Sequence, residues 1–79
     1  MKTTDRDILK FIVDNKQNIM THGVDLDKLE VIFKIPRNDI EEILEQLKVS
    51  NFIEFPDAIG TVRFITVNSK AIKFIYPNS

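Results

Sequence analysis

The stretch FKIPRNDIEEILEQLKVSNFIEF, residues 33–55, constrains the fold of this chain more than any other. Pro36 disfavours helical geometry at the residue before it and is well placed to start a new helix, so one helix ends and another begins here. The inward residues of the second helix recur at helical spacing: Ile40, Ile43, Leu44 and Leu47. Asn51 tolerates the left-handed conformation that often ends a helix. We therefore predict a helix over residues 36–50 that follows its predecessor after a tight turn.

Two further helices are predicted before Pro36. Residues 4–18 carry a wide apolar face at helical spacing, and Thr4 and Asp7 have the spacing of a capping box at its start. Residues 25–34 form a short amphipathic helix, in which Asp25 is the expected N-cap. Asn and Gly interrupt the pattern between the two helices, and Val24 is the residue there most suited to a strand-like contact.

After Asn51 the apolar pattern changes from helical to alternating. The segments FIEF and TVRFITV flank PDAIG, whose Pro, Asp and Gly favour a turn, so we predict a β-hairpin over residues 52–67. Residues 68–76 either form a short helix that starts near Ser69 and stops before Pro77 or extend the sheet, and we favour the helix. All 79 residues are expected to form one domain, since so short a chain cannot divide its core in two.

This order of elements resembles the winged helix-turn-helix superfamily, and in particular its small bacterial and archaeal transcriptional regulators. Ile35 stands where a hydrophobic residue closes the turn in that superfamily, and Asn51, Phe52 and Ile53 stand where the third helix ends and the wing begins. The segment FITVNSKAIKFI is also similar to the sequence after the wing in MarR-like and PadR-like regulators, although Ser69 replaces their usual Gly. The resemblance implies an α+β fold, with a three-helix core followed by a two-stranded wing.

The resemblance also implies that the helix over residues 36–50 reads double-stranded DNA. The matching base-contact positions are Arg37, Asn38 and Glu41; Arg pairs well with guanine and Asn with adenine. The matching phosphate contacts are Lys28, Lys34 and Arg63. The function expected from the resemblance is therefore that of a DNA-binding transcriptional regulator.

The charge of the chain argues against this expectation. Eleven basic and twelve acidic residues give a net charge of −1, whereas nucleic-acid binders usually carry a basic excess that neutralises phosphates. Glu41, Glu42 and Glu45 would face the phosphates, and the lysines can equally be read as ordinary solubilising residues. The alternative is a protein-interaction module of the same fold with an acidic third helix and no DNA binding.

The chain also carries more large apolar side chains than a minimal winged helix buries easily. The candidates for an interaction surface lie near the C-terminus: Ile72, Phe74, Ile75 and Tyr76. They indicate a homodimer or a protein partner, unless the segment simply covers the open side of the domain.

Catalytic, metal and cofactor sites are not expected. The chain has no Cys and a single histidine, His22, without a second ligand at motif spacing. Its two Gly are too far apart for a phosphate-binding loop. With no apolar run long enough to span a bilayer or to act as a signal peptide, we expect a cytoplasmic protein that is not an enzyme.

Overall fold

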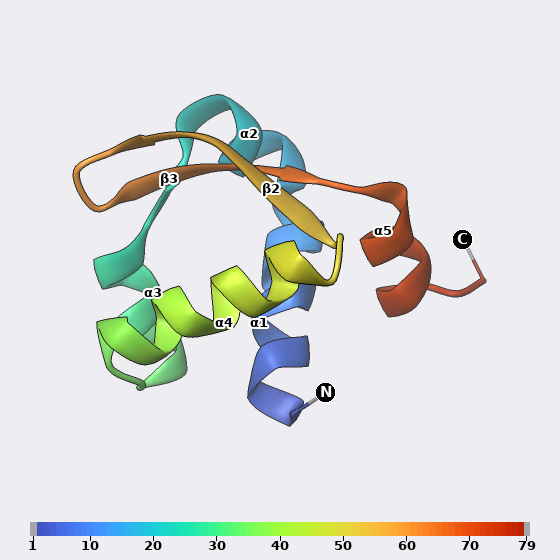
Figure 1. The fold of residues 1–79 in the computed structure, drawn as a ribbon, viewed down its shortest axis with the longest axis horizontal. Helices are drawn as coiled ribbons and strands as arrows, with labels where there is room; N and C mark the ends of the chain where they lie inside the picture. The colour runs from blue at the N-terminus through green and yellow to red at the C-terminus, as the bar shows by residue number, and fades with distance from the viewer. Residues whose placement is uncertain (1, 79) are drawn as a thin grey trace.

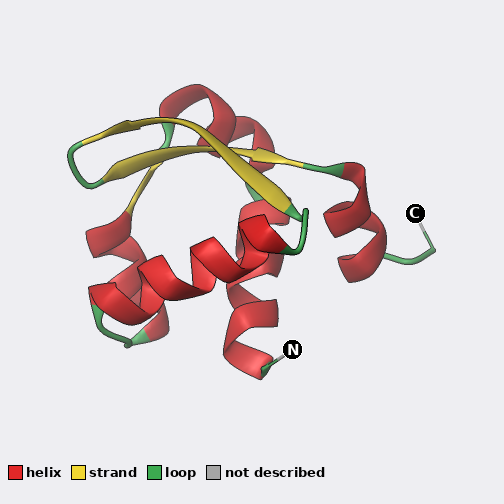
Figure 2. Cartoon of the chain, in the orientation of Figure 1, coloured by secondary structure: helices red, strands yellow, loops and turns green. Residues whose placement is uncertain are grey.

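The computed structural model describes residues 2–78, which form an α+β domain with five helices and a three-stranded antiparallel sheet (Figures 1 and 2). The helices are α1 (Thr3–Asp14), α2 (Lys16–His22), α3 (Leu26–Phe33), α4 (Arg37–Val49) and α5 (Ser69–Ile75). The strands are β1 (Val24–Asp25), β2 (Ile53–Ile59) and β3 (Val62–Val67), in the order β1–β3–β2. Along residues 2–78 no helix is both long enough and apolar enough to cross a bilayer.

The core lies between the helices and the sheet. Its fully buried side chains come from α1, α3, α4, α5, β2 and β3: Ile8, Leu9, Ile12, Leu26, Leu29, Ile40, Ile53, Ile65 and Ala71. The inward residues predicted for the third helix are buried in α4, except Ile43, which is partly buried. Within residues 2–78 no polar or charged side chain is buried, so the core is entirely apolar and its stability rests on apolar burial.

The predicted turn around Pro36 is confirmed. Helix α3 ends at Lys34, which adopts the left-handed conformation (φ 57°), and Pro36 is the extended residue before α4. Asn51 is also left-handed (φ 64°), and the amide of Phe52 donates to the carbonyl of Leu47 at 3.0 Å, which closes the end of α4. The left-handed Lys34 was not anticipated, because neither Gly nor Asn marks that position.

The predicted helix over residues 4–18 is interrupted at Asn15, and its last residues belong to a second helix. Asn15 separates α1 from α2, and α2 includes residues that were assigned to a connection. The amide side chain of Asn15 donates to the carbonyl of Phe11 at 2.8 Å, a side-chain bond that competes with continuing the helix. Helix α2 packs against β3, and Ile19 is buried there. The expected capping box at Thr4 is also absent, since Lys2 is the N-cap of α1 and makes no side-chain capping bond.

The hairpin over residues 52–67 is present, but its turn lies later than predicted. Strand β2 runs through Pro56 to Ile59, and the turn is at Gly60 and Thr61. The strand pairing shifts register between Glu54 and Asp57, around the proline that cannot donate to the ladder. The sheet has a third strand, because Val24 pairs with Arg63 as the strand-like contact predicted for it, so the two-stranded wing was too simple an expectation.

The C-terminal segment is helical, as favoured from the sequence. Ser69 is the first residue of α5, and Asn68 rather than Ser69 is its N-cap. Helix α5 packs against α1 with Ala71 and Ile75 inward. Just beyond it, the Tyr76 hydroxyl donates to the Asp14 carboxylate, which also accepts from Lys10 at 2.9 Å. These contacts attach the C-terminal end of α5 to α1.

The contact between Tyr76 and Asp14 predicts a pH dependence. The hydrogen bond from Tyr76, followed by that from Lys10, holds the pKa of Asp14 below its usual value. Because the Asp14 pKa is lower in the folded protein than in the unfolded chain, where it is about 4, the ionised carboxylate stabilises the fold above that pH. This contribution to stability disappears as the pH falls through the folded-state pKa of Asp14. In Tyr76→Phe we expect the Asp14 pKa to rise towards its usual value, measured by NMR titration of the carboxyl carbon. An unchanged pKa would show that the two side chains do not meet in solution.

Candidate binding face around helix α4

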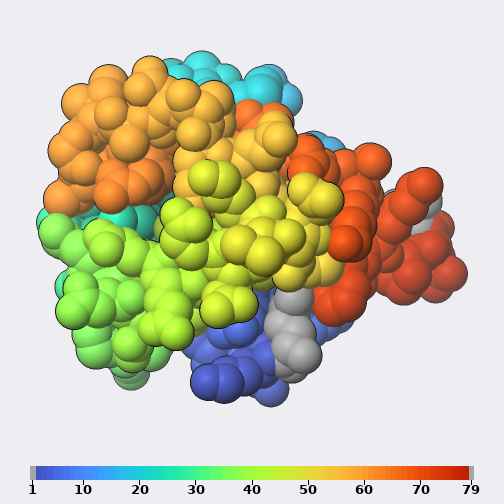
Figure 3. All heavy atoms as spheres, in the orientation of Figure 1, coloured from blue at the N-terminus to red at the C-terminus, as the bar shows by residue number. Residues whose placement is uncertain are grey.

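Helix α4 lies alongside the β2–β3 hairpin, and the two elements share one face of the molecule (Figures 1 and 3). We call this surface the α4 face and define it by the exposed acidic residues of α4: Asp39, Glu41, Glu42 and Glu45. With Arg37 and Lys48, the helix carries two basic and four acidic residues, a net charge of −2. The face is therefore electronegative where the resemblance requires contact with phosphates.

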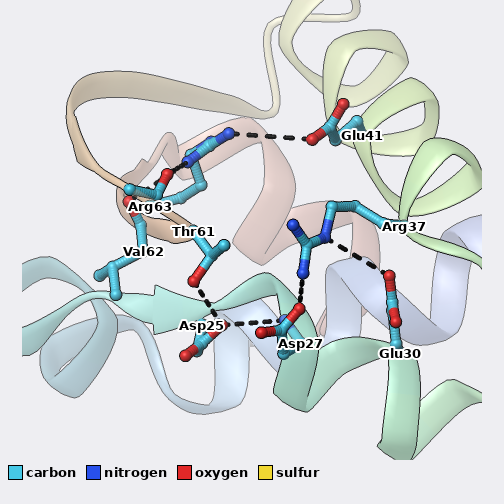
Figure 4. A network of polar contacts seen from close by, with 9 residues as sticks. Asp25, Asp27, Glu30, Arg37, Glu41, Thr61, Val62 and Arg63 are labelled. Atoms are coloured by element: carbon cyan, nitrogen blue, oxygen red, sulfur yellow. Dashed lines mark hydrogen bonds and ion pairs between the residues drawn. The ribbon is translucent and has the colours of Figure 1, made fainter.

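Arg37 points towards α3, where two carboxylates surround its guanidinium group (Figure 4). Its terminal nitrogen Nη2 forms an ion pair with Asp27, and its Nε lies 3.5 Å from Glu30 Oε1. Nε is buried and has no hydrogen bond, so its contact with Glu30 is an ion pair only. Arg37 thus links the first turn of α4 to the first half of α3, and its charge is already compensated.

Arg63 is also engaged within the molecule. Its Nη1 donates to the carbonyl of Gly60 at 2.7 Å, and its Nη2 lies 3.9 Å from Glu41 Oε1 (Figure 4). The side chain is only 25% exposed. Arg63 therefore ties the hairpin turn to α4, and the only arginine near the hairpin is directed at a carboxylate.

Asp25 joins the hairpin to the start of α3. Its Oδ1 accepts from the Asp27 amide and from the Thr61 hydroxyl, both at 2.9 Å (Figure 4). The amide of Leu26 donates to the Thr61 carbonyl at 3.0 Å. The first of these bonds confirms Asp25 as the N-cap of α3. Asp25 thus fixes the hairpin turn relative to the two helices that carry the candidate residues.

Removing the Asp25 carboxylate should destabilise the protein. Asp25→Ala loses the cap and the Thr61 bond, and we expect the free energy of unfolding to fall by about 2 kcal/mol, measured by chemical denaturation. Asp57→Ala is the matched control, since among residues 2–78 the exposed Asp57 side chain accepts only from the neighbouring Ala58 amide. Its removal should change stability by less than about 0.5 kcal/mol. Equal losses in the two variants would contradict the capping role.

The remaining DNA-contact candidates are exposed. Asn38 lies in the first turn of α4, and Lys28 and Lys34 lie on or next to α3. Across residues 2–78 neither lysine forms an ion pair. The structure therefore pairs Arg37, Arg63 and Glu41 with oppositely charged residues. Of the six DNA-contact candidates, those that form no ion pair within residues 2–78 are Asn38, Lys28 and Lys34.

Two hollows flank α4. One, of about 180 Å³, lies between α4 and the hairpin and is lined by Glu41, Leu44, Glu45, Phe55 and Arg63. The other, of about 480 Å³, lies between α4 and the start of α1 and is lined by Lys2, Thr4, Asp5, Ile35, Asp39, Glu42, Ile43 and Gln46. In both hollows the apolar lining residues are partly or fully buried. In both, the carboxylates of the lining outnumber its basic groups.

The apolar candidates near the C-terminus separate into two groups. Ile75 is buried in the core, which corrects its assignment to a surface, and Ile72 is partly buried. Phe74 and Tyr76 are 43% and 37% exposed. The ring centroids of Phe74 and Phe52 are 5.1 Å apart. The segment therefore packs on the domain through Ala71, Ile72 and Ile75 and leaves Phe74 and Tyr76 at the surface.

Sequence reasoning missed Asp27, Glu30 and Thr61 as parts of the site. Asp27 and Glu30 stand on the polar side of α3, a pattern shared by any solvent-facing helix, and nothing in it shows that Arg37 lies opposite.

No cluster of three potential metal ligands occurs among residues 2–78. Comparisons with protein-family models, with curated proteins and with solved structures find no significant match.

Proposed function

We propose that the chain is a winged helix-turn-helix protein whose α4 face binds a basic segment of a partner protein. Helices α1, α3 and α4 would be the three core helices, and the β2–β3 hairpin would be the wing. The proposal describes a binding module rather than an enzyme.

One observation carries the choice of partner: Arg37 and Arg63 are already paired with carboxylates, whereas α4 carries exposed acids that are not paired. Asp39, Glu42 and Glu45 form no ion pair with any residue from 2 to 78. Binding DNA here would bring these charges towards phosphates, whereas affinity for DNA comes largely from basic groups that release counterions. Electrostatic complementarity instead favours a cationic protein surface.

DNA binding by a transcriptional regulator is the second candidate. The short turn between α3 and α4 and the exposed Asn38, Lys28 and Lys34 favour it. In the helix-turn-helix mode the second of the two helices enters the major groove with its N-terminal residues towards the bases. Arg37 would then have to leave Asp27 and Glu30 to reach a base.

A direct comparison of ligands separates the two candidates. Fluorescence anisotropy would measure the binding of the protein to a lysine-rich peptide and to a duplex of about 20 base pairs in the same low-salt buffer. We expect the peptide to bind, and the duplex to bind no more tightly than about 10⁻⁴ M. Tighter duplex binding without peptide binding would overturn the proposal in favour of the second candidate. Sedimentation of the protein alone would show whether the partner is a second copy of the chain.

A further inference from the structure

We infer that the hollow between α1 and α4 receives an amphipathic, basic helix of the partner, with an apolar side chain on its floor and basic side chains towards its rim. The inference rests on the proposed function and specifies where the partner binds and which chemistry it presents. The occupant is a protein helix with lysine or arginine beside an apolar stripe.

Two of the residues that line the hollow are apolar, and we call these two side chains its floor. Ile35, from the turn before α4, and Ile43, from its middle, line the hollow and are both partly buried, and both pack against the core. An apolar side chain that covers them removes more apolar surface from water at about 25 cal/mol per Å². The floor therefore offers a contact that a purely hydrophilic ligand would not use.

Three of the residues that line the hollow are acidic, and we call these carboxylates its rim. Asp5 comes from α1, and Asp39 and Glu42 come from α4, so that carboxylates approach the hollow from two helices. None of the three forms an ion pair within the described residues, and Lys2 is the one basic residue that lines the hollow. The charge around the floor is thus negative, which suits lysine or arginine side chains placed beside an apolar anchor.

The secondary structure around the hollow favours a helix as the occupant. Its lining residues belong to α1, to α4 and to the segments just before them, so no strand edge is available for an extended peptide to join. Six of the eight lining residues are polar, whereas small-molecule pockets are lined mostly by apolar groups. Recognition must therefore come from side chains, as when an amphipathic helix lies in a groove between helices.

The test compares two peptides of identical composition. One places leucines at i, i+3, i+4 and i+7 among lysines, and the other scrambles the same residues so that no apolar stripe forms. Anisotropy should show the amphipathic peptide binding at least about tenfold more tightly than the scrambled one, because only it can cover the floor.

Two charge reversals then locate the binding site. Glu42→Lys changes the hollow beside α1, and we expect it to weaken binding of the amphipathic peptide about tenfold. Glu54→Lys is the matched control, since it makes the same change at an exposed residue of β2 that lines neither hollow beside α4. It should weaken binding less than about threefold. Both residues are exposed, so both variants should fold.

The outcomes distinguish the inference from the proposed function. If both peptides bind equally, or if Glu42→Lys weakens binding no more than Glu54→Lys does, the inference is overturned, while binding of a basic peptide still supports the proposed function. If neither peptide binds, both the inference and the proposed function fail.

Discussion

Gly23→Ala should lower the free energy of unfolding by about 3 kcal/mol, because left-handed strain and overpacking add at this position. Gly23 has φ +79°, and a Cβ there would lie 2.4 Å from Val62 Cγ1 and 3.2 Å from the Arg63 carbonyl oxygen. The backbone has little freedom to move away, since the Gly23 amide donates to the Ile19 carbonyl at 2.9 Å and Val24 pairs with Arg63. Chemical denaturation of the two proteins would measure the difference.

Gly60→Ala is the matched control for this prediction. Gly60 also has a positive φ, +59°, but a Cβ there would meet no atom within 4 Å. The substitution should therefore cost only the left-handed strain, about 1 kcal/mol. If both variants lost the same stability, the close approach of Gly23 to β3 would not exist in solution.

The second large effect concerns DNA. Replacing Glu41, Glu42 and Glu45 together by lysine should raise affinity for duplex DNA at low salt by at least about tenfold, because α4 then presents cations to the phosphates. The change also frees Arg63 from its pairing with Glu41. Titrations across a salt series would show the logarithm of the binding constant falling more steeply with the logarithm of salt concentration, by about 2 to 3 in slope.

A control variant tests whether the position of the new charges matters. Lysines at Gln17, Asn18 and Thr21 add positive charge to exposed positions on α2, away from α4. This variant changes the net charge by +3, half of the +6 of the α4 variant, so net charge alone would give it about half of the gain in the logarithm of the binding constant. We expect much less than half. If it gained half or more, net charge would control DNA affinity, and the acidity of α4 would not explain the weak binding expected of the natural chain.

The sequence predicts the helices on either side of Pro36 well, because the physical causes there are local. Proline placement, helical spacing and a left-handed Asn51 act within a few residues of one another. Two predictions were wrong because the residue type concerned occurs in more than one local structure. Asn15 was read as part of a helix but bonds back to Phe11, and Pro56 was read as a turn former but lies within edge strand β2.

The candidate site was less predictable than the fold. The acidic surface of α4 follows directly from its helical spacing. The pairing of Arg37 with Asp27 and Glu30, and of Arg63 with Glu41, depends on how α3, α4 and the hairpin pack against one another. The pairing of β1 with β3 likewise joins residues far apart in the chain. Such non-local contacts leave no periodic pattern in the sequence.

The central claim is that the α4 face binds a basic protein segment, and NMR mapping of a lysine-rich peptide on the natural chain tests it most directly. We predict that amide signals of residues 37–48 shift on titration, that those of residues 16–22 in α2 do not, and that added salt reverses the shifts. The opposite result, with α4 signals unmoved by the peptide and shifted by duplex DNA, would contradict the claim.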